Sequence, residues 1–265
     1  MNYKIGFIGC GNMGGALIKA VAATLKKGEI AVCDQDAEKT AKMEKEYGAA
    51  ALTAEELAKS AGFVVLGVKP QVMEQALSPI AEILRNRTDV TVVTMAAGLS
   101  ISAIQGFIGK ALPVIRIMPN TPVTLGHGMV LYSLSGVSDE AHGAFRAYFE
   151  KAGAFDLVTE EELDKGGALS GCGPAFVYLF TEALIEGAKE LGLSAEQATQ
   201  YATQTVKGAA EMMLSFGDPA ALRKAVCSPN GTTLAGISAM EEKGFSDAAK
   251  TAVLAAYQRT LELKK

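Results

Sequence analysis

The chain has 265 residues, enough for two domains of ordinary size, and its 49% hydrophobic and 20% charged residues exclude a disordered protein. The formal net charge of −4 leaves no basic surplus, so neither a nucleic acid nor an anionic membrane is expected as a partner. The four Cys lack CxxC spacing and only two His are present, which predicts free thiols and no metal site.

The chain begins with MNYKIGFIGCGNMG, where a short apolar run from Lys4 to Ile8 is broken by Gly9. This run is too short for a signal peptide or a membrane-spanning helix. From this pattern we expect a cytoplasmic protein without a membrane segment.

The same run predicts a strand that leads through a GxGxxG turn into a helix. In a dinucleotide-binding fold the first Gly makes the turn, the second lets the backbone approach a pyrophosphate, and the third packs helix against strand. A Gly-rich turn can also serve packing alone. Here a second predicted strand, Glu29 to Cys33, ends at an acidic residue that can bind the adenosine ribose hydroxyls. The predicted cofactor-binding residues of this region are Gly9, Gly11, Asn12, Met13, Gly14 and Asp34.

Further elements alternate between helix and strand, which predicts a doubly wound parallel sheet with helices on both faces. The predicted helices cover residues 36–47, 54–60, 71–84 and 100–109, and the predicted strands cover 63–68, 90–95 and 113–118. Ligands of such sheets bind at the carboxyl ends of the strands. The loops there add Val68, Lys69, Pro70, Ala97, Gly98 and Asn120 to the predicted cofactor site.

Apolar segments at 128–133 and 153–158, on either side of a helical segment at 138–150, predict a hairpin-like pair of strands. From Glu160 onward the pattern is helical, with helices expected from Ser170 and over 194–216, 218–226, 232–242 and 246–263. We therefore predict a Rossmann-type domain over 1–159 and an all-helical domain over 160–265. Broad apolar faces, rich in Ala and Gly, favour burial against a second copy.

The segment AVCSPNGTT, residues 225–233, interrupts these helices with a polar corner. Hydroxyls at Ser228, Thr232 and Thr233, together with the free amides of a helix N-terminus, could receive a carboxylate. An ordinary capped corner with a Pro-Asn-Gly turn is an equally good interpretation of this segment alone.

With both motifs in hand, the sequence resembles the pyrroline-5-carboxylate reductase family over nearly its whole length. The segments that carry the resemblance are IGFIGCGNMGGAL, VKPQ, AAG, RIMPNTP, ALSGCGPAFVYLFTEAL and SPNGTT. The resemblance implies reduction of 1-pyrroline-5-carboxylate to L-proline, the last step of proline biosynthesis, with NADPH or NADH. It also implies an interlocked homodimer that often assembles into decamers. The substrate-binding residues implied are Ser228, Gly231, Thr232 and Thr233, with backbone groups of Ala225 and Val226.

Two residues depart from the family pattern. Asn230 stands where Gly is common, a change that Asn tolerates because it accepts left-handed dihedrals. Asp34 stands where many members have Ser, Thr or Asn, and a carboxylate there would repel the 2′-phosphate of NADPH. We therefore expect a leaning toward NADH, which Lys39 and Lys42 would weaken if they fold back.

The implied chemistry needs no metal, nucleophilic Ser or His-based triad, because the cofactor supplies the hydride. Thr233 is the candidate catalytic residue that passes a proton to the imine nitrogen, through its hydroxyl or a bound water, with solvent as the alternative source. Two other functions remain open. A 3-hydroxyacid-dehydrogenase-like reductase would need a Lys and an Asn where Val177 and Phe180 stand, and a non-catalytic dinucleotide sensor would not need the SPNGTT corner.

Overall fold

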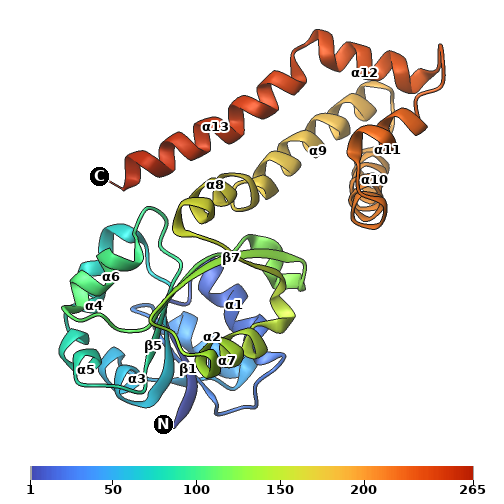
Figure 1. Cartoon of the computed structure of the whole chain (residues 1–265). Coiled ribbons are helices and arrows are strands. Elements are labelled where there is room, and N and C mark those ends of the chain that lie inside the picture. Colours follow the sequence, from blue (N-terminus) through green and yellow to red (C-terminus); the bar gives the residue numbers. More distant parts are fainter. Residues whose placement is uncertain (1, 265) are drawn as a thin grey trace. The chain divides into compact units, whose positions relative to one another are not determined.

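The computed structural model describes residues 2–264. The chain forms two compact units (Figure 1). The first contains the residues up to Cys172 together with those from Ala256 onward, and the second contains Gly173–Ala255.

One sheet of eight strands forms the centre of the first unit, in the order β3-β2-β1-β4-β5-β6-β7-β8. The strands are β1 (Tyr3–Ile8), β2 (Ile30–Cys33), β3 (Ala50–Ala51), β4 (Ala61–Leu66), β5 (Thr91–Thr94), β6 (Val114–Met118), β7 (Gly128–Ser135) and β8 (Gly153–Leu157). The strands β1 to β6 are parallel, β7 runs antiparallel to β6, and β8 is parallel to β7. The strands β1 and β4 are buried along most of their length. This is expected for apolar strands in a sheet that is covered on both faces.

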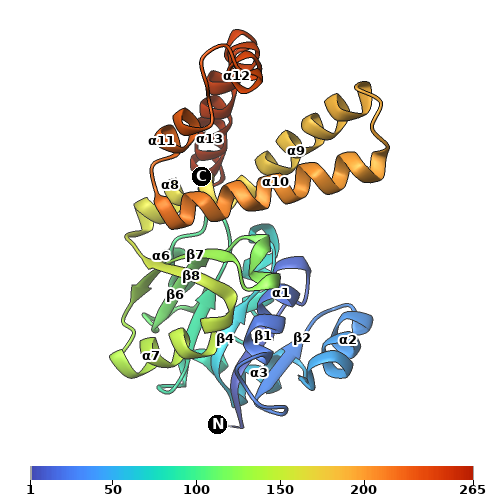
Figure 2. The same ribbon diagram turned by 90° about the vertical axis from the view of Figure 1, so that its right-hand side faces the viewer.

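Helices cover both faces of this sheet (Figures 1 and 2). One face carries α1 (Asn12–Ala22), α2 (Ala37–Tyr47) and α7 (Asp139–Tyr148). The other carries α3 (Ala54–Ser60), α4 (Met73–Leu77), α5 (Ala81–Arg85) and α6 (Ile101–Ile108). Short 3-10 turns are η1 (Pro70–Val72), η2 (Thr121–Leu125) and η3 (Glu150–Ala152), and α8 (Glu160–Ser170) packs on β6 and β7. The doubly wound arrangement predicted from the alternation of elements is confirmed.

Three local predictions differ from the structure. The hairpin-like pair is wrong, because α7 is a crossover that returns the chain parallel, and β7 finds its antiparallel partner in β6. The single helix predicted over 71–84 is broken after Leu77, since Pro79 has no N–H to donate to a helix. The two-residue strand β3 was not predicted, because two alanines give no strand pattern.

The second unit is helical. It contains α9 (Gly173–Glu190), α10 (Ala195–Phe216), α11 (Pro219–Ala225), α12 (Thr232–Glu242) and the first part of α13 (Phe245–Leu263). The helices α9 and α10 lie side by side (Figure 2). Within residues 2–264, α9, α12 and α13 bury no residue, and α10 buries only Ala198 and Ala202. Large apolar side chains are exposed instead, among them Leu179, Tyr201, Met212, Leu214 and Phe216.

The stretch Glu160–Glu190 passes a test of length and hydropathy for a membrane span, within the residues that the structure describes. Its first helix, α8, packs on the sheet and contains Asp164, a carboxylate that is 1% exposed and ion-paired. Length and composition alone are weak evidence for a membrane span. The predicted domain boundary at 159/160 stays a prediction. It was placed where the strand pattern of the sequence ends, whereas the compact units of the structure divide after Cys172.

Candidate functional site

The Gly-rich turn after β1 depends on glycine for a different reason at each position. Gly9 has φ +104°, and a side chain there would come within 2.7 Å of the main chain of Gly67. A side chain at Gly14 would collide with the carbonyl oxygen of Gly9. At Gly11 an added Cβ would meet no protein atom within 4 Å, so the space in front of it is open. This open space suits the close approach of a pyrophosphate.

Asp34, at the end of β2, holds this turn in place. Its Oδ2 accepts a hydrogen bond of 2.7 Å from the backbone N–H of Cys10, and its Oδ1 accepts one of 2.9 Å from the N–H of Asp36. The side chain is 13% exposed, and Lys39 Nζ lies 3.9 Å from Oδ1. The carboxylate thus joins the Gly-rich turn to the loop before α2, and it carries its charge at the edge of the cavity described next.

A cavity of about 570 Å³ lies at the carboxyl ends of the central strands. The predicted residues that line it are Gly9, Gly11, Asp34, Val68 and Lys69. The sequence reasoning did not find the opposite part of the lining, which includes Gln35, Ala54, Val72, Gln75 and Pro79. Gln35 follows β2, Ala54 begins α3, and the other three lie in or beside η1 and α4, where no motif marks them. The volume and the position at the strand ends fit an extended nucleotide.

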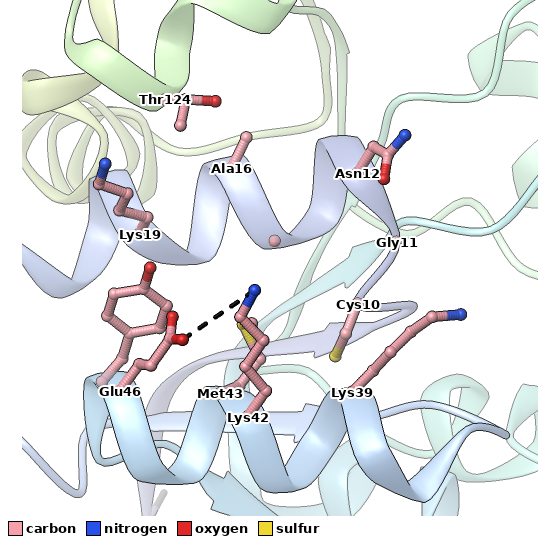
Figure 3. A pocket seen from close by; sticks show the side chains of 12 residues that line it. Cys10, Gly11, Asn12, Ala16, Lys19, Lys39, Lys42, Met43, Glu46 and Thr124 are labelled. Carbon is pink, nitrogen blue, oxygen red and sulfur yellow. Dashed lines mark ion pairs between the residues drawn. The ribbon is translucent and has the colours of Figure 1, made fainter.

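A second cavity, of about 350 Å³, lies between α1 and α2 (Figure 3). It shares Gly11 and Lys39 with the first cavity and adds Lys19 and Lys42. Lys42 does not reach Asp34; its Nζ lies 4.0 Å from the carboxylate of Glu46. Of the two lysines expected to weaken the repulsion at Asp34, only Lys39 therefore stands close to it. Asn12 lines this second cavity.

The other predicted cofactor residues line neither cavity. Met13 packs against the core, Gly14 is buried in α1, and Pro70 begins η1. Ala97 and Gly98 form the loop after β5, where Gly98 has φ +79°. The side chain of Asn120 is already committed: its Nδ2 donates to the Ser170 carbonyl oxygen at 3.0 Å and its Oδ1 accepts from Met129 N–H at 2.9 Å. This amide fixes the loop after β6.

Two thiols stand beside the Gly-rich turn. Burial raises the pKa of Cys10 to about 12, with the negative charge of Asp34 as the next cause. The pKa of Cys33 is raised by the same two effects. All four cysteines are free, as expected. Both thiols therefore stay protonated at neutral pH and act as small apolar groups.

In the second unit, the polar corner predicted at 228–231 joins α11 to α12. Asn230 has φ +58°, the left-handed conformation expected of it. Gly231 is the N-cap of α12; its N–H donates to the Ser228 carbonyl oxygen at 3.0 Å, and a side chain on it would collide with Ser228 Oγ. Thr232 and Thr233 form the first turn of α12, and Ala225 and Val226 end α11, with Val226 66% exposed.

The helix starts of the chain differ in a systematic way. A side chain caps α2, α3, α6, α7, α8, α10 and α11. By contrast, α1 and α12 begin at Gly11 and Gly231, with no side-chain cap and no acidic residue in the first turn; α4 and α5 also lack a side-chain cap, but each has a glutamate in its first turn. The first-turn N–H groups of α1 and α12 can therefore donate hydrogen bonds to a ligand, and each of these helices offers it the positive end of its dipole.

Two family models match successive parts of the chain. Residues 160–263 match the family model for pyrroline-5-carboxylate reductase dimerisation, and residues 4–98 match that for coenzyme F420-dependent NADP oxidoreductases. The pyrroline-5-carboxylate reductase of Escherichia coli strain K12 is 35% identical over 270 residues, covering 100% of both chains.

Solved structures give the same picture. A pyrroline-5-carboxylate reductase from Coxiella burnetii superposes with a TM-score of 0.89 at 31% identity, covering 100% of both chains. A pyrroline carboxylate reductase from Plasmodium falciparum with NADP bound superposes with a TM-score of 0.90 at 29% identity, covering 100% of this chain and 99% of that one. The whole chain is thus similar to these enzymes, and a Rossmann-type unit followed by a helical one is their shared plan.

Proposed function

Since the chain belongs to the pyrroline-5-carboxylate reductase family and reduces 1-pyrroline-5-carboxylate to L-proline with a nicotinamide dinucleotide, we propose that the two uncapped helix starts hold the two anionic groups of the reaction. The N-terminus of α1 would receive the dinucleotide pyrophosphate, and that of α12 the substrate carboxylate. The single observation that supports both assignments is that α1 and α12 begin at a glycine with neither a side-chain cap nor an acidic residue in the first turn, whereas the uncapped α4 and α5 each have a glutamate there.

In this proposal the cofactor is bound by the Gly-rich turn, Asp34 and the loops after β4, β5 and β6. The residues assigned are Gly9, Gly11, Asn12, Met13, Gly14, Asp34, Val68, Lys69, Pro70, Ala97, Gly98 and Asn120. They act in different ways: Gly11 leaves room for the pyrophosphate, Lys69 lines the cavity, and Asn120 holds its loop in position. The bound dinucleotide supplies the hydride for the imine carbon.

The substrate would be bound by the corner between α11 and α12. The first-turn amides of α12 and the hydroxyls of Ser228, Thr232 and Thr233 offer hydrogen bonds to a carboxylate, and Gly231 keeps the turn free of a side chain. Ala225 and Val226 contribute main-chain groups at the end of α11. Thr233 is the proposed proton donor to the imine nitrogen, through its hydroxyl or a water that it holds. A protonated imine is already electrophilic, so alignment and exclusion of water are the chief tasks of the chain.

We further propose that NADH is preferred. The Asp34 carboxylate lies at the rim of the nucleotide cavity, and its charge opposes the 2′-phosphate of NADPH. Lys39 offsets part of that charge, but its Nζ lies closer to Asp36, at 3.4 Å, than to Asp34. The two carboxylates and one ammonium leave a local excess of negative charge.

The match to the dimerisation model supports self-association of the chain. We propose a homodimer built on the apolar faces of the second unit, with further assembly into a decamer, in a cytoplasmic enzyme. Light scattering of the purified protein distinguishes a mass of two chains from one of ten.

The alternatives have less support. Val177 and Phe180 offer no polar group to a carbonyl at the positions where a 3-hydroxyacid-dehydrogenase-like enzyme needs Lys and Asn. A dinucleotide sensor would bind NADH without oxidising it. The decisive assay follows the absorbance of NADH and of NADPH with and without pyrroline-5-carboxylate. We expect substrate-dependent oxidation of both, with the higher kcat/KM for NADH; tight binding without turnover would favour the sensor.

A further inference from the structure

A cluster of four charged side chains, two of them buried and two about one third exposed, connects three distant segments of the first unit. Arg116 on β6 and Asp164 on α8 are each 1% exposed, and Nη2 of the arginine lies 2.6 Å from Oδ1 of the carboxylate. The second carboxylate oxygen of Asp164 lies 2.5 Å from Nζ of Lys264, just after α13. The fourth member, Glu160, lies 3.0 Å from Nη1 of Arg116. We call these four residues the Arg116 cluster.

The Arg116 cluster also fixes the start of α6. Oε1 of Glu160 accepts hydrogen bonds of 3.0 Å from Arg116 and of 3.0 Å from the backbone N–H of Ile101, the first residue of α6. The loop of residues 96–100 connects β5 to this point. One end of the loop is therefore held by the sheet and the other by the cluster.

The middle of the same loop lies against the end of α13. A Cβ added to Gly98 would come 2.9 Å from Leu263 Cβ and 3.0 Å from the Leu263 carbonyl oxygen. Such a close main-chain approach is possible only for glycine, which also accepts the φ of +79° found here. Leu263 packs on the loop, and the next residue, Lys264, is fixed by the buried Asp164.

We propose that Leu263 and Lys264 brace the loop of residues 96–100 in the conformation that binds the dinucleotide, with the Arg116 cluster as the anchor of this brace. The inference rests on the proposed assignment of Ala97 and Gly98 to the cofactor site. Leu263 and Lys264 are positioning residues, since they act through the loop. A loop that is already ordered in the free enzyme loses less conformational entropy when the dinucleotide binds, so the affinity for the dinucleotide is higher.

The test replaces Lys264 by Met in the full chain, which removes the ammonium while Asp164 keeps its pair with the buried Arg116. The matched control is Lys250→Met, within α13, where the ammonium pairs with exposed Asp247. Two quantities are measured: the dissociation constant for NADH, by fluorescence titration, and the amide hydrogen exchange of residues 96–101. For Lys264→Met we expect faster exchange in this segment and roughly two- to thirtyfold weaker NADH binding, with kcat at saturating NADH little changed. The control should change neither.

The outcomes distinguish two claims: that Leu263 and Lys264 hold the loop in place, and that the loop contacts the cofactor. Unchanged exchange in Lys264→Met would show that the segment is not braced and would overturn the inference. Faster exchange with unchanged NADH affinity would show a braced loop that does not contact the cofactor, which would overturn the assignment of Ala97 and Gly98 and the inference with it, while leaving the α1 site intact. A double-mutant cycle with Gly98→Ala and Leu263→Gly separates the local contact from misfolding. Leu263→Gly removes the Cβ that faces Gly98, so the loss of NADH affinity caused by Gly98→Ala should be smaller in the Leu263→Gly background than in the natural sequence.

Discussion

Replacing Asp34 by Asn tests the electrostatic basis of cofactor choice. The carboxylate accepts hydrogen bonds from the N–H groups of Cys10 and Asp36, and it presents a negative charge to the cavity where we propose that the adenosine ribose binds. Asn has one acceptor oxygen, so it can accept from only one of these two N–H groups and places its NH₂ group against the other. The loss of one charge-assisted hydrogen bond costs about 1.5–3 kcal/mol. Both cofactors need the same Gly-rich turn, so this loss weakens NADH and NADPH alike.

The charge has a different effect, because only NADPH carries a 2′-phosphate. Two unit charges about 4 Å apart interact by about 1 kcal/mol in water and about 4 kcal/mol at an effective dielectric constant of 20. Asp34 is 13% exposed, which places it between these limits. Removing its charge also frees Lys39, 3.9 Å away, for the phosphate. The ratio of kcat/KM for NADPH to that for NADH should therefore rise at least about fivefold.

The assay measures initial rates with each dinucleotide at fixed pyrroline-5-carboxylate. The ratio isolates the charge, since the damage to the turn is common to both cofactors and cancels. Glu38→Gln is the control, because it removes an exposed carboxylate from the first turn of α2, close to Asp34 in sequence but outside the cavity lining. A ratio that stays within twofold in Asp34→Asn, or that rises equally in the control, would refute the reasoning.

Three further changes test other parts of the chain. Thr233→Ala should raise the KM for pyrroline-5-carboxylate by about tenfold and leave the KM for NADH within twofold, with Thr233→Ser restoring most of the loss; equal loss for both ligands would mean a purely structural role. Asn230→Gly should leave the melting temperature nearly unchanged, whereas Asn230→Val should cost about 1–2 kcal/mol of unfolding free energy, because φ is +58° there; equal tolerance would argue against a strained turn. A pKa of about 12 leaves about one Cys10 thiol in ten thousand ionised at pH 8, so iodoacetamide should modify exposed Cys172 first, and Cys10 alkylation should keep accelerating up to pH 10, as peptide mass spectrometry can show. A plateau near pH 9 would contradict that burial.

The strand and helix plan could be predicted because its signals are local. The run KIGFIGCGNMG contains the strand, the turn and the helix start within a few residues, and each glycine has a steric reason visible in the structure. The left-handed conformation of Asn230 also follows from a short stretch. Strand direction is a different matter: the pairing of β7 with β8 depends on the crossover through α7, and nothing in the two strand sequences tells parallel from antiparallel.

The supporting contacts of the site could not be predicted, since their partners are far apart in sequence. Arg116 looks like an interruption of the apolar run VIRIM, and its acidic partners Glu160 and Asp164 follow 44 and 48 residues later. Asn120 stays a predicted cofactor residue, but the hydrogen bonds of its amide to Ser170 and Met129 could not be foreseen from the sequence. The cavity lining from α3 and α4 lacked any motif, because apolar and small residues there resemble ordinary surface positions.

The second unit has a consequence for how the enzyme comes into being. Helices whose apolar side chains stay open to water cannot gain enough from their own packing to offset the entropy lost on ordering them. In the proposed homodimer, folding of this unit and subunit association would be one thermodynamic event, and the midpoint of heat denaturation would rise with protein concentration.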